Sequence, residues 1–231
     1  KWMKRLAFVL AAAVGLAGDY VLENTKARFV IQGAGRARSW VPYGGTLVDA
    51  DLKRPDGEAG KDILNEMSII TGTIHGFSPE SFEIVKDGSD GKAAVLRVTG
   101  RDAGIPVVDM VLPLAPLNAK VVLEYEIAPN DAALKVTTYL TAKVRGAVRL
   151  GDGVVWDRHT LALTPGVGWD TDKLSGSTFD EQYATIPGLA CGFAPAEGQL
   201  TGSISSANMV PYMGFYKKTV NPGETVSYTR Y

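Results

Sequence analysis

The chain has 231 residues, of which 45% are hydrophobic and 21% are charged, and its formal net charge is −1. This length is enough for one large domain or two small ones, with a buried core. The balanced charge offers no basic field to nucleic acid, so nucleic acid is not an expected partner. The single cysteine, Cys191 in "GLACGFAP", excludes an internal disulfide and is expected to pack as a small buried hydrophobe.

The first 18 residues have the layout of a secretory signal peptide. "KWMKRLAFVLAAAVGLAG" begins with cationic residues, continues with an apolar run from Leu6 to Ala17 and ends in small residues. This run is too short to cross a bilayer, which needs roughly 20 apolar residues. We therefore predict an exported protein of the periplasm, outer membrane or cell surface, with a leader at 1–18 and one domain at 19–231. The alternative is a retained leader that contacts a membrane or a partner chain.

From Tyr20 onward the sequence predicts strand after strand. In "KVVLEYEI" apolar and polar residues alternate, which is typical of a half-buried antiparallel strand, and "APND" joins it to the next run as a hairpin. "KDGSDG" is a second hairpin signal. The predicted strands occupy 20–24, 27–32, 44–52, 81–85, 93–100, 106–114, 119–129, 133–144, 147–157, 161–166, 198–207, 211–220 and 224–231.

Helix is scarce in this pattern. Only "GKDILNEMSIITG", at 60–72, is predicted as an internal helix. Many short strands joined by turns predict an all-β fold, an antiparallel β-sandwich with little helix beyond the leader. The last predicted strand runs to Tyr231, which suits a partner that completes the sheet, or a chain that is a fragment of a longer protein.

The segments "YVLENTKARFVIQ" and "GGTLVDADL" are followed by "HGFSPESFEIVKDG", "AAVLRVTGRD", "PVVDMVLPL" and "KVVLEYEIAPND". In this order they resemble the opening of galactose-mutarotase-like supersandwich domains, over residues 20–143. The sequence is also similar to the N-terminal β domain of exported bacterial multidomain (lipo)proteins. The resemblance implies a mutarotase-like supersandwich.

Mutarotase chemistry needs an acid and a base on opposite sides of a sugar. The resemblance makes His75, in the His-Gly-Phe position, the candidate catalytic residue. The second histidine, His159, lies in "WDRHTLAL", which departs from the family's motif. This incomplete set favours a non-catalytic structural or interaction domain of a bacterial envelope protein, which binds glycan or packs in an assembly. An aldose mutarotase-like enzyme that uses His75 is the alternative, and a module whose activity lies in a further C-terminal domain is a second one.

Two groups of residues are candidates for binding. The aromatic residues in loop-like positions could stack on a carbohydrate or anchor a protein partner, or simply pack in the core; they are Trp40, Tyr43, Trp156 and Trp169. The acidic residues of "DADLKRPDGEAGKD" offer oxygen ligands to Ca²⁺, although their spacing misses the EF-hand order and a solvated loop is the alternative; they are Asp49, Asp51 and Asp56. No other cofactor is predicted.

Overall fold

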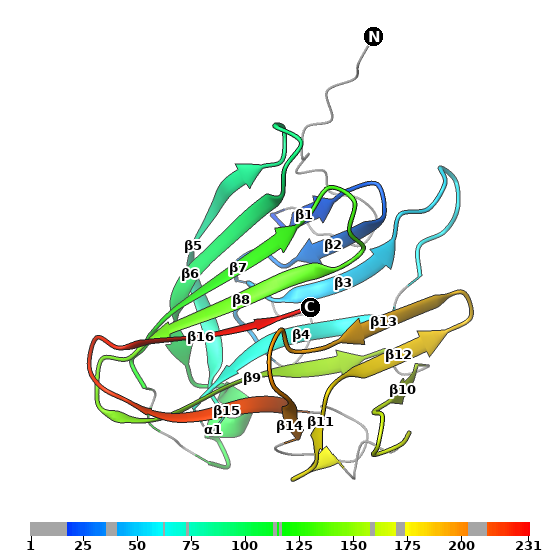
Figure 1. The fold of residues 1–231 in the computed structure, drawn as a ribbon. Helices are drawn as coiled ribbons and strands as arrows, with labels where there is room; N and C mark the ends of the chain where they lie inside the picture. The colour runs from blue at the N-terminus through cyan, green and yellow to red at the C-terminus, as the bar shows by residue number, and fades with distance from the viewer. Residues whose placement is uncertain are drawn as a thin grey trace.

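The computed structural model describes residues 18–35, 41–61, 63–72, 74–112, 115, 117–157, 160–169, 174–202 and 212–231. In these residues the regular elements are β-strands, apart from one short helix (Figure 1). The helix, α1, spans Pro106–Asp109. The strands are β1 (Tyr20–Glu23), β2 (Ala27–Ile31), β3 (Leu47–Leu52), β4 (Leu64–Thr71), β5 (Gly76–Asp87), β6 (Ala94–Ala103), β7 (Lys120–Ile127), β8 (Leu134–Thr141), β9 (Gly146–Trp156), β10 (Leu161–Leu163), β11 (Thr178–Phe179), β12 (Gln182–Ile186), β13 (Leu189–Phe193), β14 (Leu200–Gly202), β15 (Tyr212–Val220) and β16 (Thr225–Arg230).

The strands form three antiparallel sheets. A five-stranded sheet has the order β16-β8-β7-β6-β5, and an eight-stranded sheet has the order β1-β2-β3-β4-β9-β15-β14-β11. A three-stranded sheet, β10-β12-β13, lies at one side of these two (Figure 1). The all-β antiparallel sandwich predicted from the sequence is confirmed by this pairing. The hairpins expected at "KDGSDG" and "APND" are present as β5–β6 and β7–β8.

The main hydrophobic core lies between the five-stranded and eight-stranded sheets. Every second side chain of β7 is buried, and Leu123 is 1% exposed. It packs in one cluster with residues of the opposite sheet, such as Ile31 and Leu150, which are 0% exposed. Alternation in the sequence thus becomes a sheet with one face in the core and one face in solvent.

A second, smaller cluster lies on the other face of the eight-stranded sheet. Ile70 follows the core residue Ile69 on β4 and therefore points to the opposite face. There it packs with Val41 and with Ile105, the residue before α1. This contact fixes α1 and the turn after it at one end of the sandwich.

Two segment predictions are wrong. Residues 60–72 were expected to be a helix, but they contain β4, a central strand between β3 and β9. Because side chains on both faces of β4 are buried, its apolar residues do not alternate, and the run is ambiguous between strand and helix. Residues 106–114 were expected to be a strand but begin with α1, whose first residue is Pro106, a preferred position for proline in a helix. The sequence prediction also missed β11, β12 and β13.

Candidate functional site

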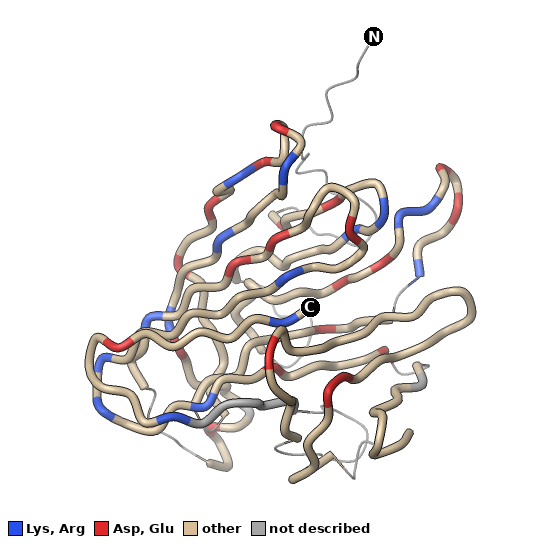
Figure 2. The backbone as a smooth tube through the Cα atoms, in the orientation of Figure 1, with Lys and Arg blue, Asp and Glu red and all other residues tan. Residues whose placement is uncertain are grey.

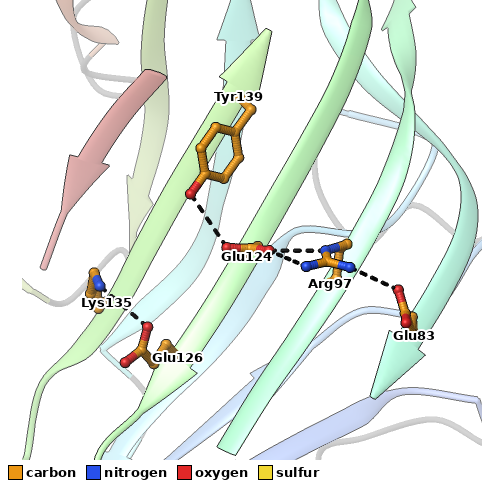
Figure 3. Close-up of polar contacts among 6 residues, drawn as sticks. All are labelled: Glu83, Arg97, Glu124, Glu126, Lys135 and Tyr139. Carbon is orange, nitrogen blue, oxygen red and sulfur yellow. Dashed lines mark hydrogen bonds and ion pairs between the residues drawn. The ribbon is translucent and has the colours of Figure 1, made fainter. Parts of the chain in front are cut away.

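The outer face of the five-stranded sheet carries an ordered array of polar side chains, which we call the polar face. These side chains alternate along the strands with the core residues, so they point to solvent. Figure 3 shows six of them on four neighbouring strands. They are Glu83 of β5, Arg97 of β6, Glu124 and Glu126 of β7, and Lys135 and Tyr139 of β8.

The strand register brings the members of this array together in rows across the sheet. Glu83 lies opposite Arg97, Arg97 opposite Glu124, and Glu124 opposite Thr137 of β8. Thr137 in turn lies opposite Thr229 of β16, and their hydroxyl oxygens are 3.0 Å apart. One continuous row of polar groups therefore crosses all five strands.

Arg97 is the centre of this row. Its Nε donates to Oε1 of Glu124 at 2.9 Å, and its Nη1 donates to Oε2 of Glu83 at 3.1 Å (Figure 3). The hydrogen bond with Glu124 raises the pKa of Arg97 above its ordinary value, so the guanidinium stays charged. Two carboxylates thus hold the guanidinium in one orientation while its side chain remains 36% exposed.

Tyr139 adds an aromatic ring beside this row. Its hydroxyl donates to Oε2 of Glu124 at 3.4 Å, and partial burial, followed by the charge of Glu124, raises the pKa of Tyr139. Lys135 and Glu126 form a neighbouring pair with a distance of 3.2 Å between Nζ and Oε2. Exposed ion pairs add only about 0–1 kcal/mol of stability each, so the array contributes more to the order of this face than to the stability of the fold.

His75 does not lie on the polar face. It forms an isolated bridge with Thr71 at the turn between β4 and β5, and it is 3% exposed. Its Nδ1 is 3.7 Å from Oδ2 of Asp102, whose side chain is fully buried. Asp102 also accepts the backbone N–H groups of Leu117 and Ala119, the latter at 2.6 Å. Asp102 thus holds the loop that leads into β7, and His75 lies beside this carboxylate.

Among the described residues, three of the candidate aromatic residues lie in separate surroundings. The Tyr43 hydroxyl donates to the Gly104 carbonyl, and the Trp156 indole donates to Oε1 of Gln182 at 2.9 Å. Trp169 is 57% exposed in the loop after β10. Trp40, like His159, lies outside the described residues.

The acidic residues considered for calcium lie in and after β3. Asp51 accepts hydrogen bonds from the Arg54 side chain and from the backbone of Leu52 and Lys61. Burial acts to raise the pKa of Asp51, but these hydrogen bonds together outweigh it and lower the pKa. Asp49 is half-buried in β3, and Asp56 is exposed in the following turn. In the described part of the chain, His, Cys, Asp and Glu form no group of three or more that could hold a metal ion. The calcium site stays a prediction.

An apolar cavity of about 70 Å³ opens between the sheets near β13. Trp156, Cys191 and Phe193 line it together with other apolar residues, and the charged side chain of Arg230 also reaches it. Burial, and secondarily the charge of Asp49, raises the pKa of the Cys191 thiol to about 11, so this partly buried cysteine stays protonated at neutral pH. It is an unreactive lining residue rather than a nucleophile.

Behind the cavity, Arg230 forms a buried ion pair with Asp152 of β9. Nη2 of Arg230 is 2.5 Å from Oδ1 of Asp152, and Nη1 donates to the Thr138 hydroxyl at 2.6 Å. The guanidinium also lies 4.9 Å from the ring centroid of Tyr228. This cluster joins β16 and β8 of one sheet to β9 of the other across the core.

A row of polar side chains is also buried on the outer side of the eight-stranded sheet. The backbone N–H of Gln32 donates to the Thr46 carbonyl at 2.8 Å, and Leu47 pairs with Met67, which places Thr46 beside Ser68. Gln32, Thr46 and Ser68 are at most 2% exposed. Within the described residues, their buried side-chain polar atoms have no hydrogen-bond partner.

The comparisons with known proteins give little beyond the fold. No family model matches the chain, and no curated protein matches it. The structure is similar to that of a galactose mutarotase related enzyme from Lactobacillus acidophilus, with a TM-score of 0.46 and 7% sequence identity, over 92% of this chain and 95% of that one. A likeness at this level says nothing of activity or ligand.

Sequence reasoning missed the polar face and the buried ion pair. A sequence signal for the polar face was present, since Arg97 and Glu124 each occupy the solvent side of an alternating strand. The row appears only once the registers of β5–β6 and β6–β7 are known. The residues of the ion pair are 78 positions apart and no pattern links them.

Proposed function

We propose that this chain is a non-catalytic interaction domain of an exported envelope protein and that it binds an oligosaccharide on the polar face. The observation that carries the proposal is the fixed array of Glu83, Arg97, Glu124 and Tyr139 on an accessible sheet. Carboxylates accept hydrogen bonds from sugar hydroxyls, the guanidinium donates them, and a phenol ring packs against the apolar side of a sugar.

The composition of the polar face favours a sugar over a protein as the ligand. Protein interfaces have a well-packed apolar or aromatic centre with polar groups at the rim. Here the centre is Arg97 with its two carboxylates, and the adjoining positions of β8 and β16 are hydroxyl residues such as Thr137 and Thr229. Hydroxyls and charged groups that already hold one another present donors and acceptors at little further cost in side-chain entropy.

The non-catalytic part of the proposal is supported by His75. A general acid or base must come within hydrogen-bond reach of the proton it transfers. The His75 side chain is 3% exposed and faces the buried Asp102 carboxylate. Export is supported by the cationic and apolar pattern of residues 1–18.

Ligand-observed NMR with the full chain and a panel of aldoses and oligosaccharides tests the proposal. Line broadening is expected with at least one oligosaccharide, and Arg97→Ala should weaken its binding at least about tenfold, since hydrogen bonds to charged groups contribute about 1.5–3 kcal/mol. Lys92→Ala, at an exposed lysine in the β5–β6 turn, is the matched control and should bind normally.

The same spectra decide between binding and catalysis. Exchange cross-peaks between sugar anomers that disappear in folded His75→Gln would replace this proposal with a mutarotase-like enzyme. Absence of broadening with every sugar, or equal loss of binding in Arg97→Ala and Lys92→Ala, would refute carbohydrate binding on the polar face.

A further inference from the structure

One end of the sandwich displays apolar side chains on two separate turns. After α1, Met110 and Val111 are each 85% exposed and Leu112 is 49% exposed. In the turn between β8 and β9, Val144 is 55% exposed and lies between Lys143 and Arg145. Soluble proteins seldom present three consecutive apolar residues on a turn, and such features mark interaction sites.

The turn that carries Met110 and Val111 is held firmly at its base. Ile105, which is 0% exposed, and the partly buried Val108 anchor α1 in the small cluster on the eight-stranded sheet. Backbone hydrogen bonds from Met110 to Pro106 at 3.2 Å and from Val111 to Val108 at 2.9 Å continue the turn. The fold therefore holds these apolar side chains outward.

The same end, which we call the basic end, gathers exposed cations. Register places the ends of β6, β7, β8, β9 and β15 together here, and Figure 2 shows Lys and Arg concentrated at this end, at the lower left. The exposed cations are Arg101, Lys120, Lys143, Arg145, Arg149 and Lys218.

Most of these cations are not neutralised locally. Arg101 pairs with Glu80 at 3.5 Å, and Lys218 pairs with Glu224 at 2.9 Å. Among the described residues, the other four form no ion pair. Because the whole chain has a net charge of −1, this excess is a local segregation of charge and not a property of the composition.

We propose that the basic end docks on an anionic lipid surface, with Val111 and its neighbours inserted at the level of the headgroups. Shallow insertion of apolar side chains together with attraction between cations and anionic lipid is the physical basis of interfacial binding. A bilayer accommodates two separate protrusions. A protein partner would instead require one continuous, complementary surface. Among the described residues, no helix is long and apolar enough to cross a membrane.

Fluorescence of a site-specific label tests the docking in the full chain. Val111→Cys in a Cys191→Ser background carries an environment-sensitive dye, and Ile84→Cys, an exposed site of β5, is the matched control at 53% exposure. Vesicles of phosphatidylcholine with phosphatidylglycerol should shift the emission of the label at 111 to the blue and leave that at 84 unchanged. Vesicles of phosphatidylcholine alone should give a much smaller shift.

Charge variants test the electrostatic part of the same interaction. Lys143→Glu with Arg145→Glu should weaken vesicle partitioning at least about 25-fold, at about fivefold for each basic residue lost. Lys53→Glu with Lys92→Glu, outside the basic end, should change it little. Rising salt should weaken binding because it screens the attraction.

Several outcomes would overturn the proposal. Vesicle binding without a blue shift at 111 would mean that another segment, such as residues 1–17, makes the contact. A shift at 111 that depends on protein concentration and needs no vesicles would assign the surface to contact between copies. Equal loss of partitioning in both charge variants would remove the basic end as the site.

Discussion

The buried Asp152 makes the stability of this protein depend on pH in a direction opposite to that of most paired carboxylates. Burial raises the pKa of Asp152 from 3.8 to about 6, although the attraction of Arg230 opposes the shift. The folded state therefore binds this proton more tightly than the unfolded state. Its contribution to stability is fully present below pH 3.8 and is lost as the pH rises through about 6.

The shift corresponds to about 3 kcal/mol of unfolding free energy between these limits. Other carboxylates, such as Asp51 with its lowered pKa, contribute in the opposite direction, so wild type alone does not isolate the effect. The pH dependence of the difference in unfolding free energy between wild type and Asp152→Asn isolates it, because the variant lacks this titratable carboxyl and keeps all the others. We expect this difference to fall by about 2 kcal/mol from pH 4 to pH 7, because part of the contribution is already lost at pH 4.

Urea unfolding followed by circular dichroism at several pH values measures the difference. Asp152→Asn leaves the Arg230 charge without its partner, and loss of one member of a buried pair costs about 3–5 kcal/mol. Because this cost lowers the stability of the variant at every pH, a second measurement uses wild type alone. It is a titration of the Asp152 carboxyl by carbon NMR. A constant difference across this range, or an Asp152 carboxyl that titrates near pH 4, would refute the reasoning.

Three further predictions concern buried contacts, each measured by urea unfolding. Ser68→Ala should leave stability unchanged or raise it by about 1 kcal/mol, because it removes a buried hydroxyl without a partner among the described residues. Thr138→Val should cost about 1.5–3 kcal/mol, because that hydroxyl accepts a hydrogen bond from a buried guanidinium. Equal effects of the two substitutions would contradict this reasoning. Tyr125→Phe should cost about 1 kcal/mol, since its hydroxyl donates to a backbone carbonyl at 2.7 Å, and no loss would show that this bond contributes nothing. Gly100→Ala should cost about 3 kcal/mol, because its Cβ would lie 2.1 Å from a backbone oxygen of β5. Gly146→Ala is the control, since a Cβ at that position meets nothing within 4 Å. A stability unchanged by Gly100→Ala would be inconsistent with the close approach of β5 and β6.

The part of the fold that sequence alone predicted is the part governed by short-range pattern. The alternation in 120–127 correctly places Leu123 in the core and Glu124 in solvent. The turn residues after Asp87 correctly place the β5–β6 hairpin. Both signals work because side-chain direction in a strand repeats every two residues and tight turns require particular residues.

The same local logic fails where an element is buried on both sides. The residues of β4 read as a mixed apolar run because Ile69 faces the main core and Ile70 faces the smaller cluster. The local pattern around His75 likewise gives no indication of its exposure, and the tertiary structure places it against Asp102 in the interior. The exposure of a side chain depends on which residues pack over it, and here those residues are distant in the sequence.

The sequence by itself determined that this chain folds as an antiparallel β-sandwich, because the positions of apolar residues and turns specify strands one at a time. Only the tertiary structure decided which of its polar groups act together. Register between strands builds the row from Glu83 through Arg97 to Glu124, and the stacking of the two sheets brings Arg230 to Asp152. The chain topology gathers exposed cations and exposed apolar turns at one end. Electrostatic and hydrogen-bond energies depend on distances in space, and those distances exist only after the sheets have assembled.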